Sequence, residues 1–167
     1  MKKHINIKIS GKVQGVGFRF CAYEKFVDLG FSKIYYNKKD SYFKNKKIVN
    51  IIKKAFLLNK NFLKKNIPKF KIILIYSRKE MNFLWKWKTP NYIISFAGDK
   101  KIVIFSPSAI EKETCWKKED FYSTLVHEIN HVFFKEITRT YKPIWLSEGL
   151  ASYLQNSNRK QNNKKIK

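Results

Sequence analysis

The sequence predicts an α+β fold, because strand-like and helix-like apolar patterns both occur along the chain. Strand-like segments, which alternate apolar and polar residues or contain short runs of branched apolar residues, span residues 4–10, 71–76, 92–97 and 101–105. Helix-like segments, which repeat apolar residues every three or four positions, span residues 46–65, 119–138 and 148–155. With 167 residues, of which 44% are apolar, the chain is long enough for one ordinary domain with a packed core.

The strand at 4–10 leads into the glycine-rich string GKVQGVGFR at residues 11–19, which opens a predicted helix ending near Gly30. Backbone N–H groups at such a helix N-terminus can bind an anion, and Arg19 can pair with it. The string resembles the acylphosphatase signature. This resemblance implies that Arg19 binds a phosphoryl group and that Asn37, on the strand after Gly30, orients the attacking water.

The acylphosphatase resemblance covers residues 1–40, which is about half of that fold. The family needs a second β-α-β unit, whereas residues 40–45 predict a turn and almost no strand before the next helix. We therefore expect residues 1–40 to form a partial, ferredoxin-like β-α-β segment that is vestigial or structural. Hydrolysis of acyl phosphates by Arg19 and Asn37, without a metal, stays open as an alternative function.

Residues 41–157 are predicted to form the main domain, which begins with the helix at 46–65 and the buried strand at 71–76. A short helix and a loop are expected over residues 79–90. There Trp85 and Trp87 are predicted to pack rather than to contact a ligand.

Two strands then join at Gly98-Asp99, a dipeptide suited to a tight turn. Residues 94–98 are a candidate edge strand that would pair with the backbone of an extended substrate, the alternative being an ordinary covered hairpin. Residues 110–118 are expected to be a loop.

The helix at 119–138 carries the pentapeptide HEINH. Residues four apart share one face of a helix, so His127 and His131 can bind one metal ion through their ring nitrogens. Glu128 lies beside them, where a carboxylate can take a proton from a water bound to that ion. This is the HExxH pattern of zinc peptidases, with a helix that carries two histidines by chance as the alternative. The buried stripe of this helix is predicted to comprise Phe121, Leu125, Ile129, Val132, Phe133 and Ile137.

A second motif, WLSEGLA, follows at residues 145–151. Pro143 interrupts the preceding helix, and Glu148 is expected to open the last helix, which would end near Gln155. The gap between His131 and Glu148 suits a turn that returns the carboxylate to the metal. Together the two motifs resemble those of gluzincins, and more narrowly of small peptidase-MA-like proteins. The resemblance implies that Glu148 is the third zinc ligand.

These motifs predict a zincin-like metallopeptidase domain that hydrolyses peptide bonds in a peptide or protein substrate. Zn²⁺ held by His127, His131 and Glu148 would activate water and polarise the scissile carbonyl, with Glu128 as the general base. Tyr141 or Tyr153 could stabilise the oxyanion, although a packing role suits either. A zincin retained only as a binding module ranks third, because Glu128 is present.

The net charge is +24 and the pI is about 10.0, values that would normally indicate a polyanionic partner. Lysine is scattered throughout, however, and no nucleic-acid-binding motif occurs, so specific nucleic-acid binding is not expected. Cys21 and Cys115 form no disulfide framework and are expected to be reduced. The Asn- and Lys-rich tail at residues 158–167 is expected to be disordered.

The N-terminal stretch MKKHINIKIS lacks the apolar core of a signal peptide. The apolar runs, such as residues 72–76, are too short to cross a bilayer. The sequence therefore predicts a soluble cytoplasmic protein without a membrane partner.

Overall fold

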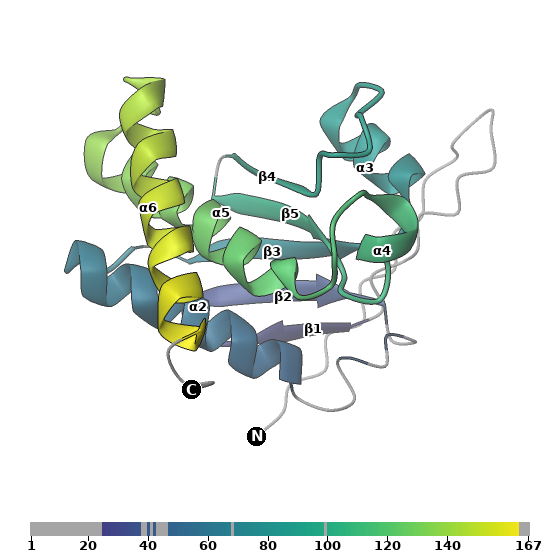
Figure 1. The fold of residues 1–167 in the computed structure, drawn as a ribbon, viewed down its shortest axis with the longest axis horizontal. Coiled ribbons are helices and arrows are strands. Elements are labelled where there is room, and N and C mark those ends of the chain that lie inside the picture. Colours follow the sequence, from purple (N-terminus) through teal and green to yellow (C-terminus); the bar gives the residue numbers. More distant parts are fainter. Residues whose placement is uncertain are drawn as a thin grey trace.

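The computed structural model describes residues 25–37, 40, 42, 47–67, 69–98 and 100–163. The predicted strand at 4–10, the string GKVQGVGFR and Arg19 lie outside these residues, as does Cys21. The described part of the chain is α+β, as predicted, with helices packed on a mixed sheet (Figure 1). No helix among the described residues is both long and apolar enough to cross a membrane.

The strands are β1 (Lys25–Asp28), β2 (Ser32–Tyr36), β3 (Phe70–Ile75), β4 (Ser95–Gly98) and β5 (Lys101–Phe105). The helices are α2 (Lys47–Leu63), α3 (Arg78–Trp85), α4 (Ile110–Glu113), α5 (Asp120–Thr138) and α6 (Ile144–Asn163). The predicted helices near 46–65 and 119–138 and the predicted strands near 71–76 and 101–105 are thus confirmed, with ends that differ by at most two residues.

The five strands form one sheet in the order β1-β2-β3-β5-β4. The three central strands run parallel, and β1 and β4 are antiparallel to their neighbours. Each parallel connection contains a helix, as crossovers between parallel strands usually do. The strand β4 is therefore an edge of the sheet in the described structure, which agrees with the candidate edge strand that the sequence offered at residues 94–98 beside a covered hairpin.

One face of the sheet carries the helices α2, α5 and α6 (Figure 1). Residues paired across strands share a face, so Ile34, Ile72 and Ile102 form a row that is fully buried beneath these helices. Burial of each such side chain contributes about 1.5–3 kcal/mol. On the edge strand, Ser95 pairs with Ile104 and faces the same side. The sheet thus directs Ser95 towards the helix that carries HEINH.

The structure corrects the helix predicted to end near Gly30, because residues 25–28 form strand β1 instead. The chain turns back between β1 and β2. There the Gly30 N–H donates to Asp28 Oδ1 at 2.8 Å, and the Leu29 N–H donates to the Ser32 carbonyl at 2.9 Å. Gly30 has a φ of +82°, which glycine adopts without strain. The C-terminal end of the segment that was expected to be β-α-β is therefore a β-hairpin, formed by β1 and β2.

Three other boundaries differ from the predictions. Residues 110–113 form the short helix α4 within the predicted loop. The last helix begins at Ile144, so Glu148 lies in its second turn and does not open it. The same helix continues to Asn163, past Gln155, so the predicted disordered tail would begin inside α6.

The two tryptophans near α3 differ in their packing. Trp85 contacts the Phe96 ring edge-on, with the ring centroids 4.6 Å apart, as a packing residue does. Trp87 is 75% exposed, so the prediction that it packs is wrong. It follows the left-handed C-cap residue Lys86, which ends α3 and turns the chain into the loop.

Candidate metal centre

Helix α5 packs against the sheet and α2 with one face, and it carries the candidate site on another. Five of the six residues predicted for its buried stripe are buried, whereas Ile137, near the helix C-terminus, is 42% exposed. The i, i+4 spacing places His127 and His131 on a second face, towards α6, with their rings 4.7 Å apart between centroids. The HEINH segment is therefore helical, with both imidazoles side by side.

A buried amide pair holds α5 against α2. The Asn59 side-chain amide of α2 donates to the carbonyls of Ala55 and Val126, at 3.0 and 3.1 Å. The Asn130 amide, from within HEINH, donates to Asn59 Oδ1 at 3.0 Å. Because both side chains are fully buried, loss of either partner would leave the other without its hydrogen bond. These contacts fix the position of α5 where the histidines lie.

Helix α6 returns Glu148 to the two histidines. Its carboxylate oxygens lie 3.3 Å from His127 Nε2 and 3.4 Å from His131 Nε2. The two Nε2 atoms are themselves 3.0 Å apart. His127, His131 and Glu148 therefore form a group that could hold a metal ion. These are the three residues that the sequence predicted as metal ligands.

The other ring nitrogens of both histidines contact side chains of α6. His127 Nδ1 lies 3.1 Å from Gln155 Oε1, and His131 Nδ1 lies 2.9 Å from Ser147 Oγ. Because an amide oxygen only accepts, the Gln155 contact favours the tautomer of His127 with the proton on Nδ1. The Ser147 hydroxyl can donate or accept, so it fits either tautomer of His131. Both contacts fix the orientation of the rings, as residues around metal ligands commonly do.

Glu128 is buried beside the metal-capable group and faces the edge strand. Its Oε1 accepts a hydrogen bond of 2.7 Å from the hydroxyl of Ser95 on β4. The pKa of Glu128 is raised to about 7: burial raises it most, the Ser95 hydrogen bond lowers it, and the nearby Glu148 charge raises it by a smaller amount. The carboxyl group can therefore exchange a proton near neutral pH.

His131 is also affected by its surroundings. Burial lowers its pKa, and the neighbouring His127 lowers it as well, whereas the Glu148 carboxylate raises it. The net shift is downward, so the neutral ring is favoured. A neutral imidazole is the form that binds metal ions.

The two tyrosines proposed for an oxyanion role have different surroundings. The Tyr153 ring packs against Phe62 of α2, with the centroids 6.0 Å apart, and the residue is largely exposed. Tyr141 follows α5, where the Lys135 ammonium lies 4.6 Å from its ring centroid. Neither contact decides between an oxyanion role and a packing role, so both alternatives remain predictions.

The acylphosphatase prediction depended on Arg19 and Asn37 acting together. Arg19 lies outside the described residues. Asn37 follows β2, and its backbone N–H donates to the Tyr76 hydroxyl at 3.1 Å. It is not part of the group formed by the histidines and Glu148.

Sequence reasoning missed the residues that orient the site: Ser95, Ser147, Gln155 and Asn59. Two of them had a local signal, because Ser147 adjoins Glu148 and Gln155 lies seven positions beyond it, two turns along one helix face. Ser95 and Asn59 had none, because their partners come from distant parts of the chain.

Searches with the chain against protein-family models, curated proteins and solved structures returned no match. The functional interpretation therefore depends on the residues and geometry of this chain.

Proposed function

We propose that this chain is a zinc-dependent peptidase with a zincin-like domain. The observation that supports this most strongly is the convergence of His127, His131 and Glu148, with the buried carboxyl group of Glu128 beside them. Two imidazoles and one carboxylate form a ligand set typical of catalytic zinc, which keeps a further position for water or substrate.

The spacing of the ligand atoms suits zinc. Ligands bound at 2.0–2.1 Å in a tetrahedral arrangement lie about 3.3–3.4 Å apart. The contact between the two histidine Nε2 atoms measures 3.0 Å, and the two oxygens of Glu148 lie 3.3 Å from His127 and 3.4 Å from His131, one oxygen to each ring. One ligand atom from each of the three residues lies within 4.8 Å of the others, so the group is close enough to close on a single ion. When bound, zinc would supply Lewis acidity, which lowers the pKa of water and polarises a carbonyl.

The residues of the chain would then move the proton. Glu128 would accept a proton from the attacking water and later deliver it to the leaving amine. Its raised pKa suits this exchange, because the best general base has a pKa near the working pH. The Ser95 hydroxyl, at 2.7 Å, would hold the Glu128 carboxyl group in one orientation.

The edge strand β4 would position the substrate. A peptide that pairs with an exposed strand edge gains main-chain hydrogen bonds without much side-chain preference. Because Ser95 lies on β4 and contacts Glu128, a peptide along this edge would pass the general base. The hydrogen bond from Ser95 to Glu128 would therefore connect the strand that binds the substrate with the residue that transfers the proton.

We do not propose acylphosphatase activity for this chain. Residues 25–28 form a strand where that resemblance requires the end of a helix. The expectation that an acyl phosphate such as benzoyl phosphate is hydrolysed no faster with the protein than without it can be measured directly. Hydrolysis that survives a chelator and disappears in Arg19→Ala would favour the alternative function.

The proposed function can be tested by incubating the zinc-loaded protein with a peptide library and identifying the products by mass spectrometry. We expect cleavage by the wild type, none after zinc removal by a chelator, and recovery when zinc is returned. The Glu128→Gln variant should bind zinc but not cleave. Zinc binding without cleavage in the wild type would favour a binding module instead.

A further inference from the structure

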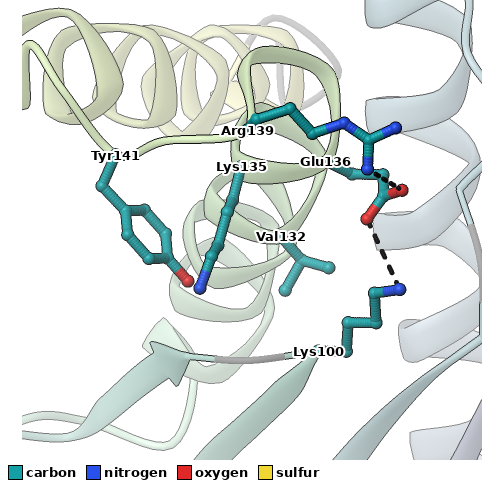
Figure 2. A pocket seen from close by; sticks show the side chains of 6 residues that line it. All are labelled: Lys100, Val132, Lys135, Glu136, Arg139 and Tyr141. Atoms are coloured by element: carbon teal, nitrogen blue, oxygen red, sulfur yellow. Dashed lines mark hydrogen bonds and ion pairs between the residues drawn. The ribbon is translucent and has the colours of Figure 1, made fainter.

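The face of α5 that carries the site continues into a pocket. His127, His131 and Lys135 follow one another at intervals of four residues, so they form one row along α5, and the C-cap residue Arg139 lies at the end of that row in the chain. Glu128, Val132 and Glu136 form the adjacent row in the same way. The cavity, of about 320 Å³, is lined by the far members of both rows (Figure 2). We call it the basic pocket; its lining residues are Lys100, Val132, Lys135, Glu136, Arg139 and Tyr141.

The basic pocket contains three cationic side chains and one carboxylate. Glu136 is shared between two of the cations, at 3.7 Å from Lys100 Nζ and 3.4 Å from Arg139. The Lys135 ammonium lies over the Tyr141 ring (Figure 2). The pocket therefore has an excess of positive charge, with Val132 and the tyrosine ring as its apolar walls. Carboxylates bind such groups through charge-assisted hydrogen bonds.

The strand β4 connects this pocket with the general base. At one end Ser95 contacts Glu128, and beyond the other end Lys100 contacts Glu136, so β4 and α5 run alongside each other in the same direction. The eight residue steps from Glu128 to Glu136 span about 12 Å of helix. An extended peptide covers that distance in three or four residues, at about 3.4 Å each.

The direction of the strand determines which part of a peptide would reach the pocket. Antiparallel strand pairs outnumber parallel ones about two- to three-fold. The strand β4 runs from the general base towards the pocket, so an antiparallel peptide runs from the pocket towards the general base. The residue in the pocket would then lie on the N-terminal side of the bond that is cleaved.

We propose, on the basis of the peptidase function above, that the basic pocket binds an acidic side chain about three residues before the scissile bond. The substrates would be peptides with Asp or Glu at that position. Lys135 and Arg139 would pair with the carboxylate, and Tyr141 would form the wall beside it. Specificity would come from this pocket, because main-chain pairing to β4 is largely independent of sequence.

The first experiment measures cleavage specificity. The zinc-loaded wild type and the Lys135→Gln/Arg139→Gln variant are compared on one peptide library, with the exposed pair Lys53→Gln/Lys54→Gln on α2 as a control of equal charge. We expect about tenfold enrichment of Asp and Glu two to four residues before the cleaved bond in the wild type and the control. The pocket variant should lose this enrichment while still cleaving. No enrichment in the wild type, or equal enrichment in all three proteins, would overturn the proposal.

The second experiment measures binding, so its outcome does not depend on turnover. Fluorescence anisotropy of the Glu128→Gln protein compares a labelled peptide containing Glu with its Gln counterpart. About tenfold tighter binding of the Glu peptide, lost with the pocket substitutions and kept with the α2 control, supports the pocket even if no peptide is cleaved. In that event the peptidase function alone fails. An equal loss of affinity for the Glu peptide in the pocket variant and in the α2 control would show that only net charge matters. It would overturn the proposed role of the basic pocket.

Discussion

Two buried carboxyl groups in this protein, those of Asp40 and Glu128, have contrasting surroundings. Asp40 accepts hydrogen bonds from the Tyr76 hydroxyl at 2.9 Å, the Ser106 hydroxyl at 2.5 Å and the Tyr42 N–H at 2.9 Å. Glu128 accepts one from Ser95, and it lies beside a second carboxylate, Glu148. For Glu128, but not for Asp40, burial opposes the negative charge with little compensation from hydrogen bonds.

The difference separates a carboxyl group that joins elements of the fold from the one that we propose as the general base. Tyr76 follows β3 and Ser106 follows β5, so Asp40 joins the ends of two neighbouring strands. Glu128 instead has a pKa of about 7 and faces the edge strand. Substitutions at the two positions should therefore separate stability from activity.

The largest expected effect is on activity at Glu128. We expect Glu128→Gln to lower kcat for peptide hydrolysis by about 10²–10⁴-fold, because the amide cannot accept the proton. Asp40→Asn should keep kcat near the wild-type value at a temperature where it is folded. Steady-state assays of both variants make the comparison. Unchanged turnover in Glu128→Gln would mean that another group is the base.

The next effect is on the pH dependence of stability in the metal-free protein. Because the folded pKa of Glu128 is about 7, above its ordinary value of 4.5, the folded state binds more protons than the unfolded state between these values. The stability from this group is fully present below pH 4.5 and is lost as pH rises through about 7. Denaturant unfolding should show a decline of up to about 3 kcal/mol. Glu128→Gln should remove that decline and Asp40→Asn should retain it.

A smaller effect is expected on stability at Asp40. Asp40→Ala removes the acceptor of the buried Ser106 hydroxyl and of the half-buried Tyr76 hydroxyl, and should lower the free energy of unfolding by about 1–3 kcal/mol. Glu128→Gln, measured by the same denaturant titration at neutral pH, should cost less, because it removes a poorly compensated buried charge. A greater loss at Glu128 than at Asp40 would reverse the assignment of structural and chemical roles.

The smallest effect is expected at Ser95. Ser95→Ala removes the hydrogen bond that lowers the pKa of Glu128, so that pKa should rise. The acidic limb of the pH profile of kcat should move to higher pH. Ser108→Ala, at an exposed serine near Asp40, is the matched control and should leave the profile in place. An unmoved acidic limb in Ser95→Ala would show that the Ser95 contact does not tune the base.

Those parts of the fold and the site that depend on local spacing could be predicted from the sequence. The helical face shared by His127 and His131 follows from a spacing of four residues, and α2 and α5 follow from their apolar periods. These features depend on residues close together in the chain. The edge position of β4 was one of two alternatives that the sequence left open, and the strand order decides it.

The parts of the fold and the site that could not be predicted depend on contacts between residues far apart in the sequence. Strand β1 was predicted as the end of a helix because the glycine-rich string resembles a family in which a helix follows it, whereas the turn at Asp28 and Gly30 determines a hairpin. The pairing of Ser95 with Glu128 depends on the tertiary arrangement of β4 and α5. The same is true of the pairing of Asn59 with Asn130. No local pattern encodes either contact.

Zinc content tests the central proposal most directly. The protein, supplied with zinc and dialysed without chelator, is analysed for metal beside His127→Ala, His131→Ala, Glu148→Ala and Glu128→Gln. We expect close to one zinc per chain in the wild type and in Glu128→Gln, no stoichiometric zinc in either histidine variant, and much weaker binding in Glu148→Ala. A wild-type chain that stays empty would contradict the metal centre, and equal affinity in Glu148→Ala and Glu128→Gln would remove Glu148 from the ligand set.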